Sequence, residues 1–156
     1  MLPLTLKIAG LHSFRQAQTI DFTRVADAGV FGIFGPTGSG KSSILDAMTL
    51  ALYGKVERSG GNRYGILNQH ETKLHVSFTF QITKRGHRQT YRVERTYKRK
   101  DGHSVQSTHA RLIQSEPEGE TVLADKETAV NEGIISILGL NADDFTRAVV
   151  LPQGKF

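Results

Sequence analysis

Cysteine and tryptophan are absent from the 156 residues, and only four residues are proline. The lack of cysteine excludes disulfides, zinc–thiolate sites and thiol catalysis, and it is consistent with a reducing compartment. No apolar run approaches the roughly 20 residues that a transmembrane helix needs. Residues 1–10 have no basic region ahead of an apolar block, so no signal peptide is expected. We therefore expect a cytoplasmic protein with no membrane partner.

The composition is that of a folded protein with an uneven charge distribution. Hydrophobic residues make up 38% and charged residues 22%, which suits one domain of ordinary size. The formal net charge is +5, and bases are concentrated between residues 84 and 100, where Glu94 is the one acid. Such a block favours an anionic partner such as nucleic acid, and a solvated strand face is the alternative. The bases are Lys84, Arg85, Arg88, Arg92, Arg95, Lys98, Arg99 and Lys100.

Alternating apolar residues predict several strands. Residues 3–9 read as a half-buried strand that forms a hairpin with residues 19–22. Residues 74–82 alternate strictly, and a return strand follows a turn at residues 84–88. With a third strand over residues 108–113, this region predicts an antiparallel β meander over about 74–113.

Other segments lack this alternation. Residues 30–34 are an unbroken apolar run, typical of a central strand buried on both faces. A helix is predicted after them, ending at Gly54, and another runs from an Asp125 cap to Leu138, with Gly139 as its stop. We interpret residues 115–120 as a surface turn, Asn141 as the cap of a short helix, and residues 148–156 as a strand broken by Pro152.

One motif carries chemistry. Residues 35–42, GPTGSGKS, fit the P-loop pattern G-x-x-x-x-G-K-[ST] at every required position, between a predicted strand and a predicted helix. Glycines let backbone N–H groups wrap phosphates, and the helix N-terminus adds donors and partial positive charge. Lys41 supplies a compact cation for the β/γ-phosphates, and Ser42 a hydroxyl ligand for Mg²⁺. The motif therefore predicts a nucleoside triphosphate with Mg²⁺.

The P-loop motif alone does not identify the class of P-loop protein, so other motifs must be considered. A GTPase would contain an Asn-Lys-x-Asp base reader, which this sequence lacks. Asp143 and Asp144 form the only adjacent acidic pair, but residues 139–142 before them are not an apolar strand. A helix start, where acids suit the dipole, is therefore favoured over a Walker B acid. A stand-alone P-loop kinase is a rival that the absence of an acceptor site disfavours.

The order of the motifs resembles the SbcC family, the bacterial ATPase subunits of the SbcCD nuclease and relatives of SMC proteins. The motifs are Gly10-Leu11-His12-Ser13-Phe14, Ile20-Asp21-Phe22, the P-loop followed by Ile44-Leu45-Asp46-Ala47, Leu52-Tyr53-Gly54, and Asp144-Phe145-Thr146 before Val150-Leu151-Pro152-Gln153-Gly154.

The resemblance implies an α/β P-loop NTPase fold, the N-terminal lobe of an ABC-type head, with an antiparallel β meander beside the P-loop core. Residues 1–156 would be this lobe, with the P-loop near 35–43 and the Q-loop near 153. The sequence contains no heptad run, no apolar strand ending in Asp-Glu and no signature motif. We therefore expect a piece of a longer protein whose coiled coil and C-terminal lobe are absent here.

The resemblance also implies partners. Two heads would sandwich two ATP–Mg²⁺, double-stranded DNA would bind the heads, and an SbcD-type metallonuclease would cut the strand in DNA repair. An SMC- or RecF-like ATP-gated clamp that holds DNA without a nuclease is the alternative.

The resemblance implies a role for each residue of this sequence that matches a functional position of the family. Lys41 and the Q-loop residue Gln153 are the implied catalytic residues, and Ser42 and Gln153 the implied Mg²⁺ ligands. The loop of His12 and Ser13 would approach the nucleotide, although relatives often have arginine at the first position, and Ile66 would line the base. The implied phosphate cradle is Gly35, Pro36, Thr37, Gly38, Ser39, Gly40, Lys41, Ser42 and Ser43. The implied DNA contacts are Arg88, Arg92, Lys98, Arg99 and Lys100; Arg95 shares strand parity with Tyr91, Val93 and Tyr97, so we expect it to be partly buried.

Overall fold

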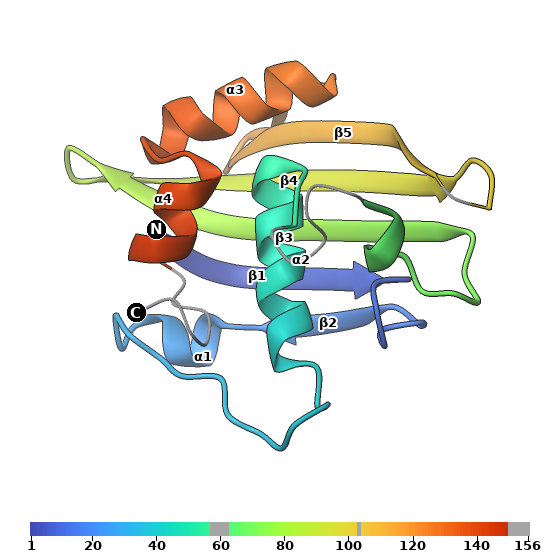
Figure 1. The fold of residues 1–156 in the computed structure, drawn as a ribbon. Helices are drawn as coiled ribbons and strands as arrows, with labels where there is room; N and C mark the ends of the chain where they lie inside the picture. Colours follow the sequence, from blue (N-terminus) through green and yellow to red (C-terminus); the bar gives the residue numbers. More distant parts are fainter. Residues whose placement is uncertain (57–62, 103, 150–156) are drawn as a thin grey trace.

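The computed structural model describes residues 1–56, 63–102 and 104–149. Its strands form one sheet in the order β2-β1-β3-β4-β5-β6, and every neighbouring pair is antiparallel (Figure 1). The strands are β1 (Leu2–Ala9), β2 (Gln18–Asp21), β3 (Lys73–Lys84), β4 (His87–Arg99), β5 (Val105–Glu116) and β6 (Gly119–Ala124).

The predicted meander is confirmed and longer than expected. Strands β3, β4 and β5 pair in succession, and the alternating apolar residues of β3 are buried from Leu74 to Phe80. The β3–β4 turn is made by Arg85 and Gly86, both at positive φ, as a two-residue hairpin turn requires. Strand β6 was not predicted, because most of its residues are exposed and an edge strand of this kind shows no apolar alternation.

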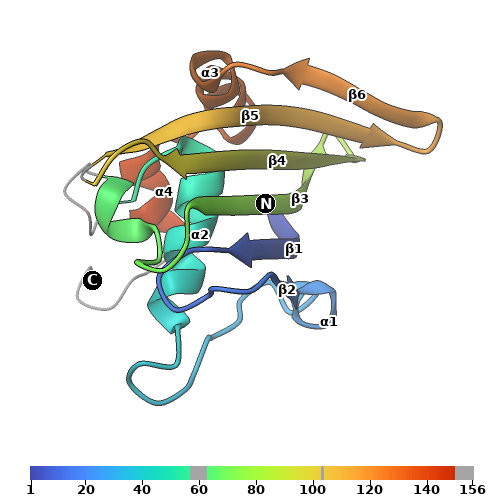
Figure 2. The same cartoon turned by 90° about the vertical axis from the view of Figure 1, so that its right-hand side faces the viewer.

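The helices are α1 (Thr23–Ala26), α2 (Lys41–Tyr53), α3 (Glu127–Leu138) and α4 (Ala142–Ala148), with a 3-10 turn η2 (Arg63–Ile66). Figure 1 shows α2, α3 and α4 on one side of the sheet, with α2 crossing the strands; Figure 2 shows the same layering from the side. The predicted stops Gly54 and Gly139 are left-handed C-caps at φ 69° and 71°. No helix in the described residues has both the length and the apolar character needed to span a membrane.

One predicted strand is wrong, and the described start of a second is not a strand. Residues 30–34 form no strand, and Val30 and Phe34 are 87% and 91% exposed. Within the described residues, this run pairs with no other strand, and apolar composition alone supplies no hydrogen-bond partner. Ala148 ends α4 and Val149 follows it as the C-cap, so neither begins a strand. Residues 150–156 of that prediction lie outside the described residues.

A buried arginine joins the sheet to two helices. Arg95 of β4 is 0% exposed, which confirms its expected burial. Its guanidinium donates to the carbonyl oxygens of Ala51 (2.7 Å) and Leu52 (2.9 Å) in the last turn of α2, and to Oδ1 of Asn131 (2.6 Å) in α3. Helix C-terminal carbonyls lack intrahelical partners and favour a cation. A Cβ on Gly54 would lie 2.9 Å from Nη1 of Arg95, so the glycine makes room for this contact.

We predict that Arg95→Met lowers the free energy of unfolding by about 3 kcal/mol or more, because it leaves buried acceptors on α2 and α3 without their donor. Arg92→Met is the matched control, since Arg92 lies on the same strand but on the opposite face, and its partly exposed ion pairs are worth about 1 kcal/mol or less. Urea denaturation of both variants measures the difference. Equal losses would show that Arg95 is not the anchor of α2.

Candidate nucleotide-binding site

The P-loop ends at an uncapped helix. Gly40 is the N-cap of α2 at φ 88°, and as a glycine it gives the first turn no side-chain cap. Gly38 is also in the left-handed region, at φ 84°. Glycine adopts this conformation without steric cost, which lets the loop turn tightly into the helix. The first-turn N–H groups of a 13-residue helix therefore have no side-chain cap, which is the arrangement that binds phosphate.

The side chain of Lys41, the first residue of α2, folds back onto the loop. Its Nζ donates to the carbonyl oxygens of Gly35 (2.5 Å) and Pro36 (2.7 Å) and lies 3.4 Å from Oγ of Ser39. Ser42 and Ser43 follow in the first turn and are partly exposed. A cation on a flexible stem, free backbone donors and a hydroxyl at the helix start together fit a nucleoside triphosphate. The Ser42 hydroxyl is the oxygen ligand that would hold Mg²⁺ here.

The N-terminal loop packs against the P-loop. A Cβ on Gly40 would lie 3.1 Å from the ring of Phe14 and 4.0 Å from Oγ of Ser13. The loop begins at Gly10, where a Cβ would lie 2.1 Å from the carbonyl oxygen of Lys73 in β3. Only glycine permits this approach of two backbones. The structure thus brings Ser13 and its neighbours to the first turn of α2. Their approach to a nucleotide stays a prediction.

His12 is held in an unusual conformation in this loop. Its φ is 47°, in the left-handed region that residues with a Cβ seldom occupy. Its N–H donates to the carbonyl oxygen of Ile66 (2.9 Å), and its Nε2 lies 3.4 Å from Oδ2 of Asp46. Asp46 is a buried residue of α2 to which the sequence alone assigned no role. The available signal was its position four residues after Ser42, on the same face of the helix.

The structure does not test the predicted nucleotide roles of two other residues, Ile66 and Gln153. The side chain of Ile66 is buried in the core at 1% exposure, and its main-chain carbonyl accepts from the N–H of His12. Its role at the base stays a prediction. Gln153 lies outside the described residues, and its Q-loop role also stays a prediction.

The predicted DNA contacts do not form one patch. Arg88 is exposed beside the β3–β4 turn, whereas Lys98 and Lys100 are exposed at the other end of β4. Ten residue steps separate Arg88 from Lys98, which corresponds to about 33 Å along a strand.

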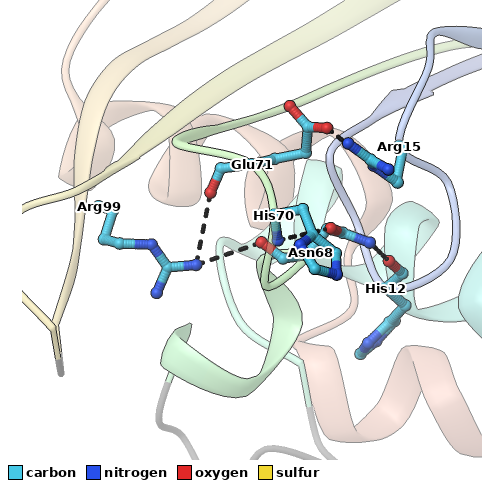
Figure 3. A network of polar contacts seen from close by, with 6 residues as sticks. All are labelled: His12, Arg15, Asn68, His70, Glu71 and Arg99. Carbon is cyan, nitrogen blue, oxygen red and sulfur yellow. Dashed lines mark hydrogen bonds and ion pairs between the residues drawn. The ribbon is translucent and has the colours of Figure 1, made fainter.

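The other two arginines are engaged within the protein. Arg92 donates to both carboxylate oxygens of Glu120 (2.6 and 2.8 Å) and to Glu94 (2.7 Å). These hydrogen bonds raise the pKa of Arg92 and lower the pKa of the Glu120 carboxyl. Arg99 donates to the carbonyl oxygens of Asn68 (3.2 Å) and Glu71 (3.4 Å) (Figure 3). Arg88, Lys98 and Lys100 therefore remain the better candidates for DNA phosphates.

The acidic pair Asp143–Asp144 lies in the first turn of α4, which confirms the helix-start interpretation. The N–H of Asp144 donates to Oδ1 of the cap Asn141 (2.9 Å), and Lys55 lies 3.7 Å from Asp143. Acids at this position suit the helix dipole.

Comparison with known proteins places this geometry in a family. Residues 5–156 match the model of a family described as AAA domain. The chain belongs to the AAA-domain family. Membership confirms the predicted P-loop NTPase class, with its mixed α/β structure and antiparallel sheet, and implies nucleotide binding.

The family resemblance seen in the sequence is also confirmed. Over its whole length, this AAA-domain chain is 61% identical to the SbcC subunit of the nuclease SbcCD from Bacillus subtilis and 46% identical to the same protein from Clostridium acetobutylicum. It is 37% identical to "Probable DNA double-strand break repair Rad50 ATPase" of Aquifex aeolicus. The chain spans 14%, 13% and 15% of the lengths of these three relatives.

We predict that Gly40→Ala destabilises this AAA domain more than Gly38→Ala does. Both positions have positive φ, so each alanine costs about 1–2 kcal/mol in backbone strain. A Cβ at Gly38 meets open space, whereas one at Gly40 meets the ring of Phe14. Urea denaturation measures the difference, which should narrow in a Phe14→Ala background. Equal costs for the two substitutions would argue against a close Phe14–Gly40 contact.

Proposed function

We propose that this chain is the ATP-binding lobe of an ABC-type head in an SbcC-like ATPase. The observation that carries the proposal is the N-terminus of α2, which follows two left-handed glycines and begins with Lys41, whose ammonium is bound by the loop carbonyls. The names of the relatives support an ATPase that works with a nuclease in DNA repair.

In this proposal, the chain binds the triphosphate and the missing elements complete the reaction. Lys41 and the first-turn N–H groups would bind the phosphates, and Ser42 with Gln153 would hold Mg²⁺, which would supply positive charge at the γ-phosphate for attack by water. The sequence contains no Walker B strand and no signature motif. The lobe alone therefore binds ATP but hydrolyses it negligibly.

The proposed partners follow from the same assignment. A second head completes each nucleotide site, an SbcD-type metallonuclease cuts the DNA, and the complex acts in the cytoplasm. The relatives named as SbcC components of the nuclease SbcCD support the nuclease partner.

We predict that Lys41→Ala lowers ATP–Mg²⁺ affinity at least about tenfold, because it removes the cation that the P-loop carbonyls hold in place. Lys55→Ala is the control, since it removes an equal charge beyond the other end of α2, where Lys55 meets Asp143. Isothermal titration calorimetry measures both affinities. Unchanged ATP–Mg²⁺ affinity in Lys41→Ala would show that the lysine does not contact the phosphates. Substantial ATP turnover by the isolated chain would contradict the proposal that the chain lacks elements needed for hydrolysis.

We further propose that the outer face of β4 contacts duplex DNA through phosphates. Arg88 and Lys98 share the strand face opposite to Arg95, and Lys98 is paired in register with Lys73. The spacing of about 33 Å between the two basic ends is close to one turn of B-DNA, about 34 Å. Both ends can therefore reach phosphates on the same side of one duplex. Such contacts are independent of sequence and weaken with salt.

We predict that charge reversal at either basic end of β4 lowers DNA affinity, and by the same factor for DNA of unrelated sequence. The variants are Arg88→Glu and the double variant Lys98→Glu with Lys100→Glu. The slope of log affinity against log salt should flatten by roughly one unit per lost contact. Glu120→Gln should raise DNA affinity and steepen this slope, because it removes the carboxylate that binds the guanidinium of Arg92. Arg147→Glu, on the helix side, controls for net charge. Titrations at four salt concentrations measure these slopes, and unchanged slopes would leave β4 as solvated surface.

A further inference from the structure

Asn68 lies at the centre of the contacts that hold the N-terminal loop. Its main-chain N–H donates to the carbonyl oxygen of Gly10 (2.9 Å), and its side-chain Nδ2 donates to the carbonyl oxygen of His12 (2.5 Å). Its Oδ1 accepts from the N–H of His70 (2.9 Å), and its own carbonyl accepts from Arg99 (Figure 3). Every polar group of this residue is therefore used to connect the loop, the segment before β3 and the end of β4.

The backbone of His12 depends on this segment. A left-handed conformation costs a residue with a Cβ about 1–2 kcal/mol, and it persists only where surrounding contacts determine it. For His12, both main-chain groups are bound by neighbouring residues: Ile66 accepts from its N–H, and Asn68 donates to its carbonyl. The second of these contacts comes from a side chain, so one substitution can remove it without altering the main chain.

The conformation of His12 sets two contacts at the nucleotide site. It places the imidazole 3.4 Å from Asp46, one helical turn after Ser42. Two residues later, the ring of Phe14 lies against the N-cap Gly40. A shift of the His12 carbonyl therefore disturbs both contacts that the loop makes with the first turns of α2.

We propose that Asn68 is a positioning residue of the nucleotide site, which acts by holding His12 in the left-handed conformation that sets the loop against α2. This inference rests on the proposed nucleotide-binding function. It also gives Arg99 a role in supporting Asn68 rather than in contacting DNA.

The test is Asn68→Asp in the full chain. The introduced carboxyl has nearly the same shape, keeps an oxygen for the N–H of His70 and leaves the main-chain bonds in place, but it loses the donor to His12. We expect ATP–Mg²⁺ affinity, measured by calorimetry, to fall about three- to tenfold, the loss of one hydrogen bond. The ratio of variant to wild-type Kd should return towards one as the pH falls towards about 4, because a protonated carboxyl donates again. A constant ratio over this pH range would show that the lost donor to His12 is not the cause of the weaker binding.

Glu71→Gln is the matched control. It removes the ion pair between Arg15 and Glu71 (3.0 Å), which joins the same two segments at a more exposed point and does not touch His12. We expect unchanged nucleotide affinity. An equal loss in this control, or wild-type affinity for Asn68→Asp, would overturn the positioning role. If Asn68→Asp does not fold, Asn68→Ser replaces it, since its side chain is too short to reach His12 but can still accept from His70.

A second readout separates this inference from the proposed function. The imidazole signals of His12 in the NMR spectrum should move in Asn68→Asp, while those of His87, at the end of β4 opposite to Arg99, stay in place. If the wild-type chain binds no ATP–Mg²⁺, the proposed function fails, but the NMR comparison still decides the positioning role. Unmoved His12 signals would overturn it.

Discussion

The position of the P-loop depends on how α2 is fixed to the sheet, and the guanidinium of Arg95 fixes the end of the helix that lies away from the phosphate site. A 13-residue helix is about 20 Å long, so a small change of angle at its C-terminus is a large displacement at its N-terminus. A planar cation with several donors suits this position, because it satisfies two helix carbonyls and Asn131 at once. The absence of a side chain at Gly54 is part of the same arrangement.

The other end of α2 is held by weaker and more local contacts. There the helix meets the loop that starts at Gly10, and the contacts come from the ring of Phe14 and the imidazole of His12. The strained backbone of His12 is maintained by hydrogen bonds from the segment before β3 rather than by burial alone. Thus the buried end of α2 is fixed by a cation within the core, and the functional end by a polar network near the surface, where nucleotide can reach the helix.

Sequence reasoning succeeded where one local signal decides the structure. The alternation from Leu74 to Phe80 placed β3, and the two stop glycines placed the ends of α2 and α3. It failed where a strand forms only if another strand is available to pair with it. The apolar run at residues 30–34 has the composition of a central strand, but no described strand pairs with it. Strand β6 forms because β5 offers an edge, although its own exposed residues give no sign of it. The P-loop motif could be read directly, whereas Asn68 became visible only through its contacts in space.

The arginines of β4 show why charge counted along a sequence does not locate a binding surface. Strand parity separates Arg95, which faces the helices, from Arg92, which lies on the opposite face. Arg92 is nevertheless occupied by two carboxylates, and Arg99 by main-chain carbonyls. The planar guanidinium satisfies several fixed acceptors, whereas the ammonium of lysine is a strongly hydrated point charge on a flexible stem. On this strand the engaged arginines bind the protein itself, which leaves exposed Lys98 and Lys100, with Arg88 at the far end, to present positive charge outward. A surface of this kind attracts a phosphate backbone without reading its sequence, which is what the proposed DNA contact requires.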